Sequence, residues 1–181
     1  IQNYDLVRDT TLRIGYNFWF NDVSYQIFPK NKESPINYFE LGGEFFQVFN
    51  PNGSFNESSN DLSMEINFKN TSSIEFKISP YWAEVPVSFK FDEEEDLKKC
   101  PALPAGRYYY TPTEANWSSD YRKPVFFGFT LGGGEFYNGH QWLAATELTC
   151  RFQPVLNVAI KAQYTRLDFP NPYCGIEIFN I

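Results

Sequence analysis

The chain has 181 residues, a formal net charge of -7 and a pI near 4.8. This charge argues against nucleic acid and anionic membrane as main partners, because both require a basic surface. Aromatic residues make up 19% of the chain, which is enough for a large core or for an apolar ligand cavity. We expect one domain over residues 1–181, since all-β chains of this size commonly do not split.

Alternation of apolar and polar residues predicts β-strands in the first part of the chain. The strands Thr10–Phe20 and Val23–Phe28 are expected to form a hairpin with its turn at Asn21-Asp22, a pair that suits a two-residue turn. Residues Ile36–Phe49 are expected as two short strands broken at Gly42-Gly43. The first part of the chain thus predicts two antiparallel units.

The alternation continues to the C-terminus. A second hairpin is expected around Asn70-Thr71-Ser72, and Gly132-Gly133-Gly134 is expected as a wide turn. Residues Pro112–Pro124 are expected as a polar connection, and Gln141–Leu148 as a short helix or the start of a strand. Further strands are predicted at Leu62–Phe68, Ile74–Ser79, Val87–Phe91, Tyr108–Thr111, Val125–Leu131 (buried), Leu156–Ile160 and Ile176–Ile178. These elements predict an all-β, antiparallel β-sandwich with little helix.

Residues that carry chemistry are few. His140 is the only histidine and is expected to be exposed and structural, and neither a metal site nor a cofactor is predicted. The acidic run Asp92–Asp96 is expected to be a solvated loop rather than a calcium site. A glycosidase would need two carboxylates facing each other across a cleft. The candidates for such a pair are Glu40, Glu44, Glu135 and Glu147.

We expect a secreted protein from the start of the chain, and this expectation bears on its cysteines. Ile1 follows no basic or apolar leader, as expected after removal of a signal peptide. Three cysteines, Cys100, Cys150 and Cys174, allow one disulfide and leave one thiol free or bridged to another chain. The sequons at Asn56, Asn70 and Asn116 lie in stretches rich in turn residues and are expected to be glycosylation sites.

One region carries a more specific pattern. The segment Cys100–Tyr110 opens with Cys-Pro and continues to Ala-Gly-Arg-Tyr, Pro124–Phe129 follows, and Cys150 precedes the alternating strand Val155–Ile160. In this pattern, residues 98–162 resemble the C-terminal half of ML-domain lipid-recognition proteins, which include ganglioside-activator-like secreted proteins. The resemblance implies an immunoglobulin-like β-sandwich whose two sheets admit an apolar ligand. It also implies a Cys100–Cys150 bridge, which leaves Cys174 for a protein partner or a disulfide-linked oligomer.

We therefore expect a secreted, glycosylated, non-enzymatic protein that binds a lipid or another apolar ligand between two sheets. The alternatives are a structural or interaction protein of an extracellular assembly, and a carbohydrate-binding or glycoside-cleaving sandwich. Apolar pockets are typically lined by aromatic side chains that point inward from strands. The residues expected to line the ligand site are Tyr16, Phe18, Phe20, Phe89, Phe91, Phe127 and Phe129.

Overall fold

The protein consists of β-strands and their connections. A computed structural model describes residues 3–5, 10–13, 15–89, 101–152 and 154–181, with the backbone alone described in the first two ranges. The described residues contain no helix. The strands are β1 (Asn3–Asp5), β2 (Thr10–Arg13), β3 (Asn17–Ile27), β4 (Ile36–Phe49), β5 (Phe55–Phe68), β6 (Ser73–Ile78), β7 (Tyr81–Val85), β8 (Gly106–Tyr110), β9 (Pro112–Ser118), β10 (Val125–Phe136), β11 (Gly139–Phe152), β12 (Leu156–Asp168) and β13 (Ile176–Asn180).

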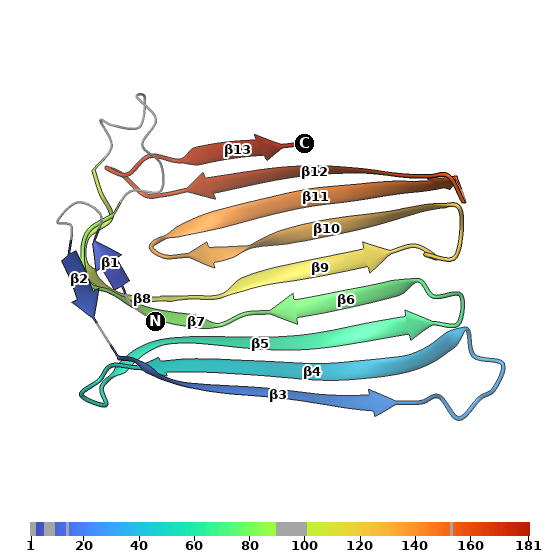
Figure 1. The fold of residues 1–181 in the computed structure, drawn as a ribbon, viewed down its shortest axis with the longest axis horizontal. Coiled ribbons are helices and arrows are strands. Elements are labelled where there is room, and N and C mark those ends of the chain that lie inside the picture. Colours follow the sequence, from blue (N-terminus) through green and yellow to red (C-terminus); the bar gives the residue numbers. More distant parts are fainter. Residues whose placement is uncertain (1–2, 6–9, 14, 90–100, 153) are drawn as a thin grey trace.

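The main sheet has eleven strands, and all of its pairings are antiparallel. Its order is β13-β12-β11-β10-β9-β6-β5-β4-β3, with β7 paired to β5 and β8 (Figure 1). The predicted all-β, antiparallel class with little helix is confirmed. The described strands form one continuous sheet and a separate β1–β2 pair, whereas the sandwich expectation placed two sheets face to face.

The two faces of the sheet differ in chemistry, because residues that pair across antiparallel strands point to the same side. We call one side the apolar face. One row across it is Tyr25, Leu41, Met64, Phe76, Ala115, Leu131, Ala144, Tyr164 and Phe179. We call the other side the polar face. Its adjacent row is Gln26, Glu40, Glu65, Glu75, Asn116, Thr130, Ala145, Gln163 and Asn180.

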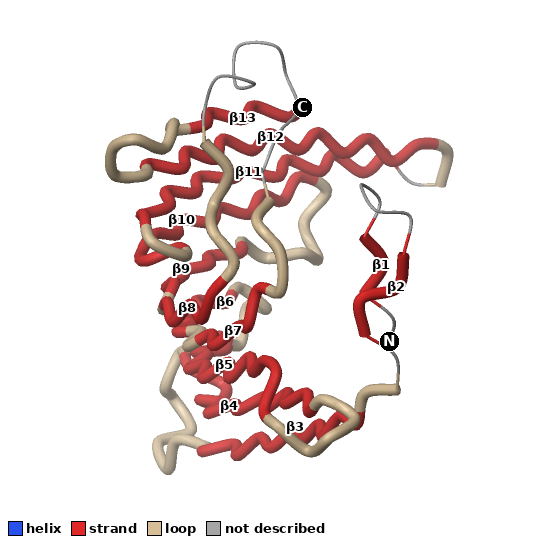
Figure 2. Tube along the Cα trace, turned by 90° about the vertical axis from the view of Figure 1, so that its left-hand side faces the viewer, coloured by secondary structure: helices blue, strands red, loops and turns tan. Residues whose placement is uncertain are grey.

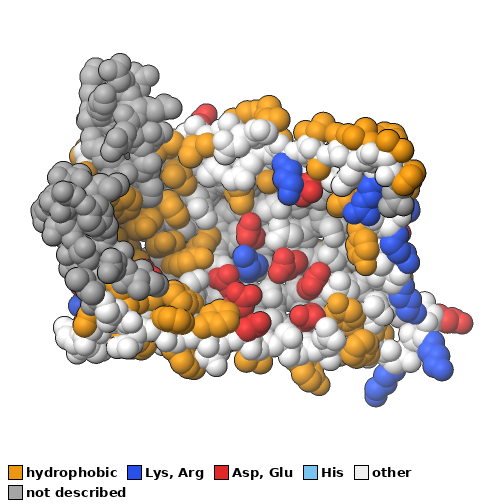
Figure 3. Space-filling model, in the orientation of Figure 1, with side chains coloured by type: hydrophobic (Ala, Val, Ile, Leu, Met, Phe, Trp, Pro, Cys, Tyr) orange, Lys and Arg blue, Asp and Glu red, His pale blue; other side chains and the backbone are white. Residues whose placement is uncertain are grey.

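The sheet is curved. Figure 2 shows both lateral ends of the sheet, β3–β4 and β11–β12, bending toward the side on which the β1–β2 pair stands apart. Figure 3 looks onto this concave side, where Asp and Glu side chains gather over the middle strands. The polar face is therefore concave, and the apolar face is convex.

A small core lies at one end of the strands. The buried hydrophobic side chains of the described residues are Val48, Leu103, Tyr110 and Leu167. Tyr110 is 8% exposed and stacks on Tyr81 with ring centroids 5.3 Å apart. Tyr137 adds a further ring contact, 4.9 Å from Tyr110. This aromatic packing is local, so most of the apolar side chains of the sheet remain outside it.

The hairpin predicted at Asn21-Asp22 is wrong, because β3 runs through both residues without a turn. Asn21 pairs with Phe45, and Asp22 pairs with Glu44. Pairing with β4 along the whole of β3 gives these residues a ladder partner, and this tertiary context overrides their local preference for a turn.

The glycine-rich stretches lie within strands and not in turns. Gly42-Gly43 lies inside the unbroken strand β4, and Gly132-Gly133-Gly134 lies inside β10, so the predicted break and wide turn are both wrong. Side chains of neighbouring strands approach the glycines closely. A Cβ atom on Gly132 would lie 3.1 Å from Glu114 Cγ and 3.3 Å from Leu143 Cβ. These glycines mark close packing rather than chain reversal.

The remaining strand boundaries agree only in part with the predicted ones. The connection expected at Pro112–Pro124 contains strand β9, and the ambiguous stretch Gln141–Leu148 is part of β11. The strand Val125–Leu131 exists, but Phe127 and Phe129 are each 45% exposed, so it is not buried. Of Val87–Phe91, the described part forms one isolated bridge, Phe89–Leu103. Strands are confirmed at Leu62–Phe68, Ile74–Ile78, Tyr108–Tyr110, Leu156–Ile160 and Ile176–Ile178.

Candidate functional site: an exposed apolar sheet face

The apolar face carries large hydrophobic side chains that no other part of the described chain covers. Phe76 is 48% exposed, Leu131 is 50% exposed and Trp142 is 59% exposed. Exposed apolar patches that extend over several strands are rare on monomeric soluble proteins and mark interaction or ligand sites. Further members of this face with at least 40% exposure are Trp19, Val23, Tyr25, Ile27, Leu41, Leu62, Met64, Ile78, Tyr109, Val125, Phe127, Phe129, Leu148, Phe152, Leu156, Val158, Ile160 and Phe179.

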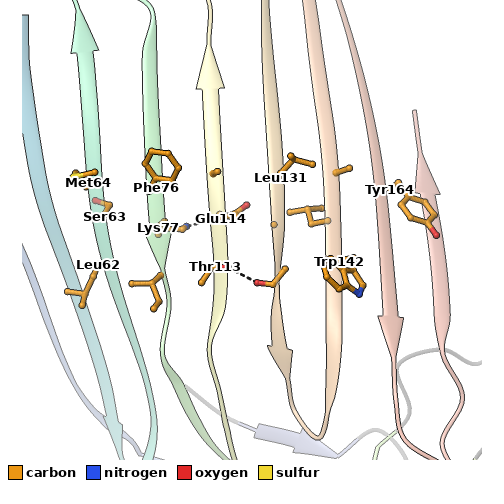
Figure 4. Close-up of a pocket in the computed structure, with 16 residues that line it drawn as sticks. Leu62, Ser63, Met64, Phe76, Lys77, Thr113, Glu114, Leu131, Trp142 and Tyr164 are labelled. Carbon is orange, nitrogen blue, oxygen red and sulfur yellow. Dashed lines mark hydrogen bonds and ion pairs between the residues drawn. The ribbon is translucent and has the colours of Figure 1, made fainter. Parts of the chain in front are cut away.

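A shallow groove of about 1060 Å³ crosses the middle of this face (Figure 4). Large side chains border it on both sides. They are Leu62, Met64, Phe76 and Ile78 from β5 and β6, and Leu131, Trp142 and Tyr164 from β10, β11 and β12. The floor between them is formed by small residues, among them Ala115, Gly133 and Ala144. The hollow thus results from a change in side-chain size across the sheet rather than from a gap between two layers.

The polar face is bound together by hydrogen bonds. Asn116 is central, because its Nδ2 donates to Glu75 Oε2 at 3.1 Å and its Oδ1 accepts from Thr130 Oγ1 at 2.7 Å. Gln26 Nε2 donates to Glu40 Oε2 at 2.7 Å. These bonds link neighbouring strands, so Glu40 and Glu75 have structural partners on this face.

Lys77 lies among the carboxylates of the polar face. Its Nζ is 3.4 Å from Glu114 Oε2 and 3.8 Å from Asp61 Oδ2. Partial burial lowers the pKa of Lys77, but Glu114 and Asp61 raise it by more, and the net direction is upward. Lys77 therefore stays charged and offsets part of the acidity of this face.

The predicted ligand residues are not brought together. Phe18 and Phe20 point to the polar face at one end of β3, and they are 63% and 55% exposed. Phe127 and Phe129 lie on the apolar face, and Phe89 contacts Tyr137 in the aromatic core. Tyr16 precedes β3, and Phe91 lies outside the described residues. Of the six that the structure describes, none lines the groove.

The sequence pattern of the groove residues predicts their strands but not their proximity. Leu62 and Met64 alternate in one strand, Phe76 and Ile78 alternate in another, and both patterns predicted the strands correctly. Alternation places side chains on a face but does not say which strands are neighbours, and β6 pairs with β9 across residues 79–111, which include β7 and β8. Trp142 was hidden because its segment also had helical spacing.

The cysteine pairing differs from the one that the resemblance implies. Cys150 is a free thiol, and Cys174 is disulfide-bonded. The expectation of a Cys100–Cys150 bridge with Cys174 left over is therefore wrong, and Cys100 itself lies outside the described residues. Cys150 pairs with Val125 and Val158 on the apolar face, where a cysteine packs as a small apolar side chain.

The sequons also differ in setting. Asn56 lies in β5, is 4% exposed and donates from Nδ2 to Asn50 Oδ1 at 2.8 Å. Asn116 lies within β9 in the hydrogen-bonded row described above. The exposed turns expected at these two positions are therefore wrong. Asn70 does occupy an exposed turn between β5 and β6, as predicted.

The candidate chemical groups form no common site. Glu40, Glu44 and Glu147 lie on the polar face, while Glu135 pairs with His140 on the register of the apolar face. Glu147 in β11 is five strands away from Glu40 and Glu44 in β4, at about 4.8 Å per strand, so these carboxylates do not form a close pair across one cleft. His140 is exposed at the start of β11. The acidic run Asp92–Asp96 lies outside the described residues, and the residues that the structure describes contain no group of three or more His, Cys, Asp or Glu suited to a metal ion.

Comparisons of the chain with protein-family models, with curated proteins and with solved structures found no match. Within the described ranges, no helix has the length and hydropathy to cross a membrane. Inference about function therefore rests on the exposed apolar face and on the charges around it.

Proposed function

We propose that this chain is a non-enzymatic protein that binds a lipid or another apolar ligand on the apolar face of its sheet. The observation that carries the proposal is the exposure of the groove residues, among which Leu131 and Trp142 are at least half exposed. Each Å² of apolar surface removed from water contributes about 25 cal/mol, so a ligand that covers this face gains substantial free energy. The ligand lies on one sheet instead of between two.

The proposed function also places the protein in an oxidising, extracellular compartment. Disulfides persist in secreted and extracellular proteins and are rare in the cytosol. The bonded state of Cys174 supports secretion, and the exposed turn at Asn70 offers a position for a glycan.

The test compares two substitutions that add the same negative charge to opposite faces. Leu131→Glu places a carboxylate at the groove, and Gln163→Glu places one on the polar face; both positions are exposed, so the fold should tolerate either change. Titration with a fluorescent fatty acid should show binding that Leu131→Glu weakens at least about tenfold, because a charge must lose water against an acyl chain. Gln163→Glu should bind like the wild type.

The rival function, a structural or interaction protein, is favoured by the free thiol of Cys150 on the same face. If the fatty acid does not bind and the protein instead associates with itself through the apolar face, the assembly function replaces the lipid-binding one. Analytical ultracentrifugation of the wild type and of Leu131→Glu distinguishes the two, since only a self-association through this face is weakened by the variant.

A further inference from the structure

The strand ends along one edge of the sheet are rich in cations. The connections β3–β4, β5–β6, β9–β10 and β11–β12 all lie at this edge because neighbouring strands run in opposite directions (Figure 1). Figure 3 shows Lys and Arg side chains along the same edge, at the right. We call this edge the cationic rim. Its cationic residues are Lys30, Lys32, Lys69, Arg122, Lys123 and Arg151.

The rim has a positive surplus although the whole chain carries a net charge of -7. The acidic side chains in the same connections are Glu33 and Asp120, and Asp120 Oδ1 pairs with Arg122 Nε at 3.1 Å. Lys30, Lys69 and Lys123 are exposed. The net charge of the whole chain argues against anionic lipid as a partner. That single value conceals the positive surplus at the rim, because most acidic residues lie elsewhere in the chain.

Exposed aromatic side chains are interleaved with these cations. Phe28 is 62% exposed, Tyr121 is 54% exposed and Phe152 is 60% exposed. Each lies within two residues of a rim cation in the sequence. Aromatic rings and long basic side chains are the groups that prefer the level of lipid head groups, because both combine an apolar body with a polar or charged end.

The apolar face extends away from the rim over a length suited to acyl chains. In β10 it runs from Val125 to Gly133, and in β12 from Leu156 to Tyr164. At about 3.4 Å per residue, each run spans about 27 Å, which exceeds the roughly 15 Å that the acyl chains of one leaflet occupy in a bilayer core of roughly 30 Å. The rim therefore lies where an apolar layer would give way to its head groups.

Building on the proposed function, we infer that the apolar face binds an anionic phospholipid layer, with the head groups at the cationic rim and the acyl chains along the strands. The curvature of the sheet favours lipid over a second copy of this chain. Two convex faces touch over a narrow strip, whereas acyl chains adapt to a curved surface. The charge separation sets the orientation, and the apolar face supplies most of the affinity.

The experiment measures co-flotation of the protein with phosphatidylcholine vesicles, with and without phosphatidylglycerol as about a third of the lipid. The test variant, Lys30→Gln/Lys69→Gln/Lys123→Gln, removes three rim charges. The matched control, Arg107→Gln/Lys161→Gln/Arg166→Gln, removes the same charge away from the rim, because Arg107 and Arg166 lie toward the opposite strand ends and Lys161 lies on the polar face. Both triple variants are compared with the wild type by circular dichroism to establish that they fold.

The wild type should bind the anionic vesicles at least about tenfold more tightly than the neutral ones, since each Lys or Arg near an anionic surface contributes about 1 kcal/mol. The rim variant should lose this preference, the control should keep it, and added salt should weaken it. Equal binding to both vesicles, or equal loss in both variants, would overturn the inference while leaving lipid binding intact. Failure to bind either vesicle would count against the proposed function itself.

Discussion

Trp142 lies directly over Gly133 on the apolar face, so that a Cβ atom added to the glycine would meet the indole Cε3 at 3.2 Å. The indole ring packs on the backbone at Gly133. A side chain larger than that of glycine would displace the ring. Gly133 and Trp142 also line the same groove. The glycine that was mistaken for a turn therefore sets the position of an exposed tryptophan at the candidate site.

Gly133→Val should move the indole ring and narrow the groove. We expect a shift of the tryptophan emission and weaker fatty-acid binding, with a change of less than about 1 kcal/mol in the free energy of unfolding, because valine is the better strand residue. The emission shift should vanish when Trp142→Phe is added. Gly106→Ala is the control, since no atom lies within 4 Å of the added Cβ. An emission shift that persists without Trp142 would show that another tryptophan responds.

Alkaline pH should destabilise the aromatic core through Tyr110. Burial, followed by the neighbouring Tyr137, raises the pKa of the Tyr110 phenol above its ordinary value. A group whose pKa is raised by folding stabilises the protein below its unfolded pKa of about 10, and this contribution is lost as the pH rises above that value. The free energy of unfolding should therefore fall steadily as the pH rises above about 10.

Tyr110→Phe isolates this contribution in urea unfolding followed across the alkaline range. At pH 8 the variant should be less stable by about 1 kcal/mol, because it loses the hydrogen bond with Tyr137. The difference from wild type should shrink above pH 10, since the variant lacks the titrating group. Tyr109→Phe, at a position that is 64% exposed, should follow the wild-type profile. Parallel profiles for wild type and Tyr110→Phe would contradict the assignment.

The thiol states predict a simple labelling pattern. Iodoacetamide applied to the unreduced, denatured protein should label Cys150, whereas Cys174 should react after reduction. Reduction should lower the free energy of unfolding by about 2 to 4 kcal/mol, as is typical when a disulfide is removed. A peptide map that finds Cys150 in any disulfide would contradict the structure, and a Cys100–Cys150 bridge would restore the pairing implied by the family resemblance.

The two asparagines of the β5 region should differ in their effect on stability. Asn56→Ala removes a buried donor and leaves Asn50 Oδ1 without this bond, which should cost about 1 to 3 kcal/mol in urea unfolding. Asn70→Ala, in an exposed turn, should cost less than about 1 kcal/mol. In protein from a secreting eukaryotic host, glycan mapping should find Asn70 occupied and Asn56 bare. Full occupancy at Asn56 would mean that the buried position is wrong.

The strands were predictable where side chains alternate, as in Leu62–Phe68 or Leu156–Ile160, because period-2 patterning depends on the local backbone alone. Local turn preferences failed at Asn21-Asp22 and at Gly132–Gly134, where pairing with neighbouring strands decides the conformation. The site was beyond prediction for a similar reason. The groove combines β5 and β6 with β9 to β12, and a single sequence does not contain the order of these strands.

The central claim is that lipid contacts the apolar face and not the polar face. Ala144 and Ala145 are adjacent in β11, are both partly exposed, and line hollows on opposite faces of the sheet. In a Cys150→Ser background, a nitrobenzoxadiazole label on Ala144→Cys should shift to the blue and be quenched when vesicles of brominated phospholipid are added. The same label on Ala145→Cys should remain unquenched and at the wavelength of a hydrated probe. Equal quenching at the two positions, or quenching at Ala145→Cys alone, would contradict the account.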